Sequence, residues 1–162
     1  DNKRIAFFSF SVFALFSFIS FLETYFYHAP YENAQGMLYG RRNAMEYIKN
    51  VENNYDPVVI SKALSEPHIF VAFYNQWDPV DYQNQSKDWL RYEKQGLSFV
   101  DQLGEYSLGK YKFRELKYDE DSQLSKTLLV GRARDFPEKV DADKIISFPD
   151  NKPAIVILSS NE

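Results

Sequence analysis

IAFFSFSVFALFSFISFL, residues 5–22, is the stretch that divides this chain into two physically different parts. Its 18 residues include no charged residue, Gly or Pro. As a helix they extend roughly 27 Å, close to the ~30 Å hydrocarbon layer of a bilayer. The four serines suit such a helix, because a hydroxyl can hydrogen-bond to the carbonyl one turn earlier or to a neighbouring helix. The sequence therefore predicts a membrane-spanning segment.

The residues on either side of this segment support a membrane location. Lys3 and Arg4 precede it, and positive charge is typical of the cytoplasmic end. Aromatic side chains of the kind that settle at the headgroup level follow it, namely Tyr25, Phe26, Tyr27 and Tyr31. We expect a transmembrane helix with an interfacial aromatic end at residues 1–28 and a soluble extracytoplasmic domain at residues 29–162. The expected location is the cell membrane, with the lipid bilayer as a partner.

Two other interpretations of the apolar segment compete with this one. A signal peptide also combines a basic start with an apolar stretch, but no small-residue cleavage pattern follows Leu22. A buried helix of a soluble core would have a polar face, which this segment lacks. Because the chain begins with Asp1 instead of Met, we expect a fragment whose upstream part, a larger transmembrane core, is missing.

Composition excludes several classes of site. The formal net charge is −4 and the basic residues are interspersed with acidic ones, so nucleic acid is not an expected partner. Cysteine is absent, which excludes disulfides, a Cys nucleophile and thiolate zinc sites. His28 and His68 are the two histidines, so a His-based metal site would need carboxylates to complete it.

Beyond Pro30 the sequence alternates between helical and strand-like periodicity, which is typical of an α/β domain. The predicted helices lie at residues 39–54, from 65 onward, at 78–82 and at 86–94. The predicted strands lie at 58–61, 111–117 and 127–130, with a closing hairpin of 144–148 and 154–158. Helices between the early strands imply parallel crossovers, whereas the hairpin must be antiparallel. We therefore expect a mixed, mostly parallel sheet covered by helices and preceded by one transmembrane helix.

The order of these pieces resembles the C-terminal region of membrane glycosyltransferases of the GT-C type, the dolichyl-phosphate-mannose protein mannosyltransferase-like group. The apolar helix and seven later segments carry the resemblance: YFYHAPY, YGRRNAMEYIKN, YDPVVIS, EPHIFVAFYNQWDPVDYQ, GKYKFREL, LLVGRARDFP and FPDNKPAIVIL. The resemblance implies a parent enzyme that transfers a sugar from a polyprenyl-phosphate donor. Its catalytic carboxylate, and a divalent metal if the parent uses one, would lie upstream. No catalytic residue, metal or cofactor is expected in this fragment.

One candidate binding group combines aromatic and polar side chains that can stack on a sugar ring and bond its hydroxyls, namely Tyr74, Trp77, Asp78 and Tyr82. The alternative, which we favour, is that the aromatic rings close the core while Asp78 caps the next helix. The helix that begins near Ser65 is expected to turn its apolar side chains inward, namely Ile69, Phe70, Phe73, Tyr74 and Trp77.

Two further groups have a functional and a structural interpretation. Arg132 and Arg134 follow a predicted strand and could hold a phosphate, although no phosphate-loop spacing accompanies them and an exposed basic turn is the default. His68 lies near the start of a helix without a nucleophile motif, which favours a structural role. The acidic run from Glu115 to Asp121 lacks the spacing of a calcium loop, so a solvated loop is expected.

Two functions from different classes remain. The first is a non-catalytic extracytoplasmic domain of a lipid-linked-sugar glycosyltransferase, in contact with the upstream membrane core and with a glycan or protein acceptor. The second is a single-pass, membrane-anchored binding module without enzymatic activity, with Trp77 at its contact surface. A free-standing hydrolase lacks a nucleophile elbow or paired acids and is disfavoured.

Overall fold

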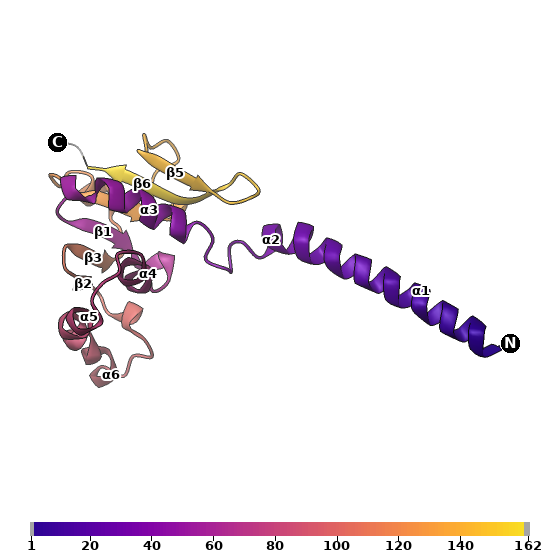
Figure 1. Ribbon diagram of the computed structural model, residues 1–162. Helices are drawn as coiled ribbons and strands as arrows, with labels where there is room; N and C mark the ends of the chain where they lie inside the picture. Colours follow the sequence, from indigo (N-terminus) through magenta and orange to yellow (C-terminus); the bar gives the residue numbers. More distant parts are fainter. Residues whose placement is uncertain (1, 161–162) are drawn as a thin grey trace.

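The computed structural model describes residues 2–160 and shows a long N-terminal helix that projects from a compact domain (Figure 1). Helix α1 (Asn2–Glu23) continues through a π-helical turn, η1 (Thr24–His28), into α2 (Ala29–Glu32). No residue of α1 is buried, and Asn2–Glu32 is long and apolar enough to cross a membrane. Ser11 Oγ donates a hydrogen bond to the carbonyl of Phe7 at 2.9 Å, as expected for a hydroxyl in an apolar helix.

The domain is built on a six-stranded sheet in the order β2-β3-β1-β4-β6-β5. Its strands are β1 (Val58–Ser61), β2 (Tyr106–Leu108), β3 (Tyr111–Arg114), β4 (Leu128–Gly131), β5 (Lys144–Ser147) and β6 (Pro153–Ser159). Central β1 pairs in parallel with β3 and β4, and the other three pairings are antiparallel. The predicted mixed α/β sheet is therefore confirmed.

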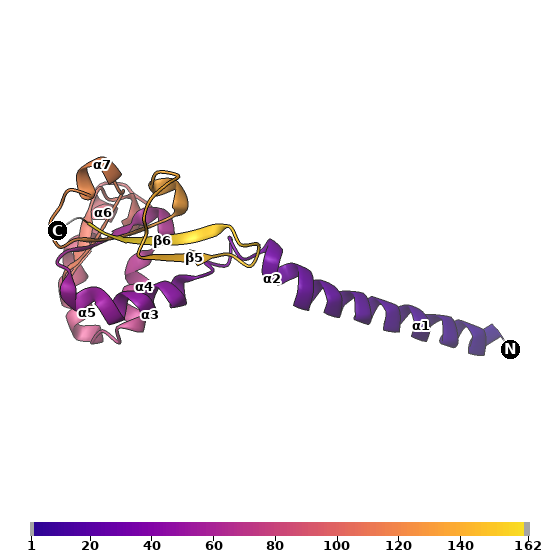
Figure 2. The same cartoon turned by 90° about the horizontal axis from the view of Figure 1, so that it is seen from above.

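Helices cover mainly one face of this sheet. The longer ones are α3 (Arg41–Val51), α4 (Pro67–Tyr74) and α5 (Pro79–Ser86), and Figure 2 shows them on the face opposite to α7 (Tyr118–Asp121). The remaining short helices are η2 (Glu52–Asn54), η3 (Lys62–Leu64), η4 (Lys87–Leu90), α6 (Arg91–Lys94), η5 (Val100–Gln102) and η6 (Ala133–Asp135). They fill the connections and the edges of the domain.

Successive side chains of the central strands point to opposite faces of the sheet, so the core consists of two clusters. Val58 and Ile60 of β1 face the helical layer, whereas Val59 faces a smaller cluster that contains Leu129 and Phe136. Both faces of β1 are therefore buried, and all four of its residues are inaccessible or nearly so. A strand that is buried on both faces has apolar side chains at successive positions, and the β-branched residues of β1 meet this requirement.

The sheet is less parallel than the spacing of the helices suggested. The first reason is β2, which we did not predict and which forms a tight hairpin with β3 around Gly109. The second is β6, which returns antiparallel beside β4 instead of pairing only with β5. Long-range pairing partners are not encoded in local periodicity, so neither feature could be deduced from spacing. Helix α7 was also not predicted, and β3 ends at Arg114, three residues earlier than expected.

Helix α4 begins as predicted but presents a different face to the core. Val71 and His68 point inward, whereas Ile69 is 48% exposed and Phe73 is 73% exposed. The expectation that Ile69 and Phe73 face inward was wrong. Inside the domain His68 has a hydrogen-bond partner, because its Nδ1 lies 3.0 Å from the hydroxyl of Tyr106, which offsets the cost of burying the imidazole.

Candidate functional site

A wide hollow of the domain lies where β1, β3 and β4 end. We call it the carboxyl-edge crevice; its volume is about 910 Å³, and it is lined by Ser61 and Lys62 after β1, by Glu115 and Leu116 after β3, and by Arg134 and Asp135 after β4, together with other residues. In sheets with parallel strands, ligands bind outside the carboxyl ends, at the point where connections diverge to opposite sides. Strand β1 is such a point, because it lies between β3 and β4: the chain runs from β1 to β2 and β3 through α4 and α5, and from β3 to β4 through α7, which lies on the opposite face in Figure 2.

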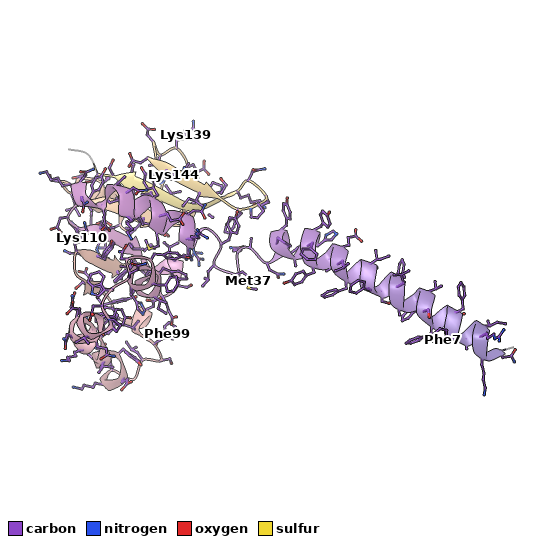
Figure 3. The ribbon with its side chains drawn as sticks, in the orientation of Figure 1. Phe7, Met37, Phe99, Lys110, Lys139 and Lys144 are labelled. Atoms are coloured by element: carbon purple, nitrogen blue, oxygen red, sulfur yellow. The ribbon has the colours of Figure 1, made fainter. Side chains whose placement is uncertain are left out.

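The carboxyl ends of β1 and β3 lie on the side of the domain from which the long helix projects. In Figure 1 both strands point toward α1, and in Figure 3 Lys110, just before β3, lies at the far side from it. Leu38, in the segment that joins α2 to α3, lines the crevice. If α1 spans a bilayer, the crevice opens toward the membrane surface.

A strained turn forms part of the crevice wall. Ser65 and Glu66 have φ angles of 55° and 46°, in the left-handed region that residues with a side chain seldom adopt. The turn is held by Asp101, whose Oδ2 accepts a hydrogen bond from the backbone N–H of Glu66 at 2.5 Å. Strain of this kind costs about 1–3 kcal/mol per residue and persists only where surrounding contacts impose it.

Asp101 also links the crevice wall to the buried aromatic core. The hydroxyl of Tyr106 donates a hydrogen bond to Asp101 Oδ1, and the same hydroxyl lies 3.0 Å from His68 Nδ1. Because that hydroxyl has one proton, the arrangement requires His68 Nδ1–H to donate to Tyr106. Burial lowers the pKa of His68, against the opposing effect of Asp101, and burial followed by the bond to Asp101 raises the pKa of Tyr106. The imidazole is therefore neutral near pH 7, and this chain of bonds fixes the crevice wall.

The lining of the crevice combines apolar and charged side chains. Apolar side chains such as Ile69, Phe70 and Phe99 alternate with carboxylates, and the cation Lys62 donates to the carbonyl of Leu103. Ser61 Oγ accepts from the N–H of Ala63 at 3.3 Å, so this hydroxyl caps η3. Within residues 2–160 no group of three or more His, Cys, Asp or Glu side chains is arranged to hold a metal ion. An amphipathic ligand with hydroxyl groups fits such a surface.

Two members of the predicted aromatic group, Trp77 and Asp78, lie at the opposite edge of the sheet. Trp77 packs edge-on against Tyr111, with ring centroids 6.4 Å apart, and it lines a shallow groove together with Asp78. Asp78 Oδ1 accepts hydrogen bonds from the N–H groups of Val80 and Asp81 at 2.8 and 3.1 Å, so its predicted capping role is confirmed.

The other two members of that group are separate from the groove. Tyr74 packs edge-on against Phe73. Tyr82 packs edge-on against Trp89, with ring centroids 5.7 Å apart. Three of the four aromatic and polar candidates, Tyr74, Trp77 and Tyr82, thus pack partly against the core. The fold does not gather the four side chains around one ligand position.

Arg132 and Arg134 lie at the carboxyl edge, where the structure adds a third arginine that the sequence did not suggest. The three line a second pocket of about 210 Å³, here called the arginine pocket, whose walls also include Gln35, Leu38, Tyr39 and Phe148. Leu38 and Arg134 line both hollows, so the arginine pocket adjoins the crevice. The third arginine, Arg41, comes from the start of α3, more than 90 residues away in the sequence.

The acidic run is partly buried instead of solvated throughout. Asp121 accepts hydrogen bonds from both terminal nitrogens of Arg114, at 2.9 and 2.5 Å, and another from the N–H of Lys117 at 2.8 Å. Burial raises the pKa of Asp121, but these hydrogen bonds outweigh it and the pKa is lowered. This carboxylate therefore fixes the end of β3 and α7.

The expected interfacial residues lie along one continuous helical segment outside the domain. Tyr25 stacks on Phe21 with centroids 5.7 Å apart and meets Phe26 edge-on at 5.1 Å. Tyr27 and Tyr31 are exposed. Large exposed aromatic rings at the end of an apolar helix suit the headgroup region of a bilayer.

Sequence reasoning missed Arg41, Lys62 and Asp101 as residues of these sites. A signal for Lys62 existed, since it follows a buried strand at what could be a carboxyl edge. No local signal existed for Arg41, because its position is that of an ordinary polar residue on a helix.

Comparison with known protein families, with curated proteins and with solved structures finds no match to this chain.

Proposed function

We propose that this chain is the last membrane-spanning helix and the extracytoplasmic C-terminal domain of a glycosyltransferase that uses a polyprenyl-phosphate-linked sugar. In this proposal the domain binds and does not catalyse. Its crevice shapes the acceptor side of the enzyme, next to the upstream membrane core. Any catalytic carboxylate and any divalent metal belong to that core.

One observation carries the proposal: the crevice is lined by residues that follow β1, β3 and β4, and in Figure 1 β1 and β3 point toward the apolar helix. A hollow in that position can meet a substrate presented at the membrane surface. Its mixture of apolar walls and carboxylates suits a glycan or a protein segment, because both combine apolar faces with hydrogen-bond donors. The order of sequence segments described above gives the same expectation.

The complete reading frame tests the parent activity. It should encode further apolar spans upstream and a carboxylate in the first outer loop. The complete protein in membranes should consume a polyprenyl-phosphate sugar, whereas this chain in lipid nanodiscs should not. A start codon directly before Asp1 would refute the transferase and leave the single-pass binding module.

The side of the membrane is tested separately by cysteine labelling, which is simple because the chain has no native Cys. Lys139 is exposed and lies on the domain away from the helix (Figure 3). A Lys139→Cys variant should react with an impermeant maleimide on intact cells, and an Asn2→Cys variant should not. The reverse pattern would place the domain in the cytoplasm and contradict the orientation inferred from Lys3 and Arg4.

A further inference from the structure

The arginine pocket concentrates positive charge without a counter-charge. Arg41, Arg132 and Arg134 line it, and none of its lining residues is acidic. The nearest acid in sequence, Asp135, accepts a hydrogen bond from the backbone N–H of Arg132 at 2.9 Å and lines the crevice instead. Three guanidinium groups in one small hollow repel one another unless an anion lies among them.

Arg41 is the most unusual of the three because it is buried. Its side chain is 9% exposed, one Nη donates to the carbonyl of Leu64 at 2.5 Å, and the guanidinium lies 5.9 Å from the ring centre of Phe70. Its Nε is buried and has no hydrogen-bond partner among the residues that the structure describes. A buried cation with an unsatisfied donor is unfavourable in the absence of a ligand.

Other arginines of the domain show the usual arrangement. Arg42 pairs with Glu46 at 2.7 Å, Arg114 pairs with Asp121 at 2.5 Å, and Arg91 pairs with Asp88.

In contrast, no ion pair within residues 2–160 reaches any of the three arginines of the pocket. Neighbouring Arg42 therefore provides a matched comparison for Arg41, on the same helix and in the same turn. The pocket arginines differ from it in having no carboxylate beside them.

The start of α3 adds to the positive potential. Gly40 precedes the helix without a side-chain cap, and the first turn has no acidic residue. Free N–H groups and the helix dipole at an N-terminus both favour anions. Arg41, the first residue of α3, lines the pocket, so this end of the helix is next to it.

The volume and the position of the arginine pocket limit the kinds of ligand that fit it. A volume of about 210 Å³ is below the ~300–1,000 Å³ of pockets for drug-sized molecules, and it suits a single tetrahedral headgroup. Gln35, Leu38 and Tyr39, from the segment after α2, form one wall, and Met37 of this segment lies between domain and helix in Figure 3. The pocket is therefore near the membrane surface if α1 spans the bilayer.

We propose that the arginine pocket binds a phosphate monoester group, with Arg41 and Arg132 as its inner ligands and Arg134 at its entrance. Guanidinium groups bind phosphate through paired hydrogen bonds, and the three arginines that line the pocket supply the donors. The inference is independent of sugar transfer, because it rests on charge and burial alone. It would hold equally for a single-pass binding module.

The test uses the full chain in phosphatidylcholine nanodiscs and follows the thermal unfolding of the domain. In one arm inorganic phosphate is titrated; in the other the nanodiscs contain phosphatidic acid, whose headgroup is a phosphate monoester. A ligand that binds only the folded state raises the unfolding midpoint, and the dependence on concentration gives an apparent Kd. Arg41→Met and Arg132→Gln are the test variants, and Arg42→Gln is the control on the same helix.

The expected result is a rise of the midpoint in at least one arm. Each test variant should weaken apparent affinity by about tenfold or more, equivalent to ~1.4 kcal/mol, and Arg42→Gln should leave it unchanged. A response to phosphatidic acid alone identifies a lipid headgroup, and a response to inorganic phosphate alone identifies a soluble ligand. No response in either arm, or an equal response in Arg41→Met and the parent chain, overturns the proposal. Arg134→Gln, on an exposed side chain, keeps the test valid if Arg132→Gln fails to fold.

Discussion

Replacing Arg41 with Met removes a buried positive charge and keeps an unbranched side chain of similar length. Burial, followed by the charge of Arg132, lowers the pKa of Arg41 from its ordinary value to about 10. At about 1.4 kcal/mol for each tenfold change in proton affinity, the buried charge costs roughly 3 kcal/mol. Loss of the hydrogen bond to the Leu64 carbonyl offsets about 1.5–3 kcal/mol of this. The free energy of unfolding should therefore stay the same or rise by up to ~1.5 kcal/mol.

Chemical denaturation in mild detergent without phosphate measures this difference. Truncation of an equally buried apolar side chain would instead cost about 2–5 kcal/mol, so the two cases are easily separated. Arg42→Met is the control, because Arg42 is exposed and its ion pair with Glu46 should contribute at most ~0.5 kcal/mol. If Arg41→Met lowers stability by more than ~1 kcal/mol, Arg41 is a structural residue and the reasoning about an uncompensated charge fails.

Two other perturbations test the fold around the sites. Asp121→Asn should cost up to about 3 kcal/mol at neutral pH, because it removes the buried carboxylate that accepts from both terminal nitrogens of Arg114 and leaves Glu105, 3.6 Å from Nε, as the remaining ion-pair partner. Because the folded-state pKa of Asp121 is lowered, its contribution is present above about pH 4 and is lost as pH falls further, so unfolding titrations should show an acid-dependent loss that the variant lacks. Gly109→Ala should cost about 1–3 kcal/mol in the same assay, since its φ is +57° and an added Cβ would lie 2.8 Å from Trp77. Gly96→Ala, with φ +71° and open space, should cost only the backbone part of this, and equal losses in the two variants would rule out the contact with Trp77.

Much of the secondary structure could be predicted because it depends on local chemistry. Strand β1 is found at the predicted residues, and the β5–β6 hairpin lies around the predicted turn, since β-branched runs and turn residues act over a few positions. The cap at Asp78 was predictable for the same reason. In contrast, β2 is only three residues long and lies in a polar region, so it has no usable period of its own.

The candidate sites were much less predictable. Arg132 and Arg134 were identified as a possible phosphate site, but their significance depends on Arg41, which α3 brings to the same pocket. Trp77 and Tyr82 are close in sequence yet pack against different partners, because the chain turns at Asp78. Proximity in sequence therefore suggested a site around Trp77 that the fold does not assemble. It also gave no sign that Arg41 joins Arg132 and Arg134.

The sequence by itself determined the apolar helix, the α/β character of the domain and the positions of most of its elements. Each of these follows from the preference of a short segment for lipid, core or water, which neighbouring residues decide. Only the tertiary structure decided the strand order, the inward face of α4, and the gathering of the carboxyl-edge crevice and the arginine pocket. These depend on contacts between residues far apart in the chain, such as Arg41 with Leu64 or His68 with Tyr106, and local propensity holds no record of such partners.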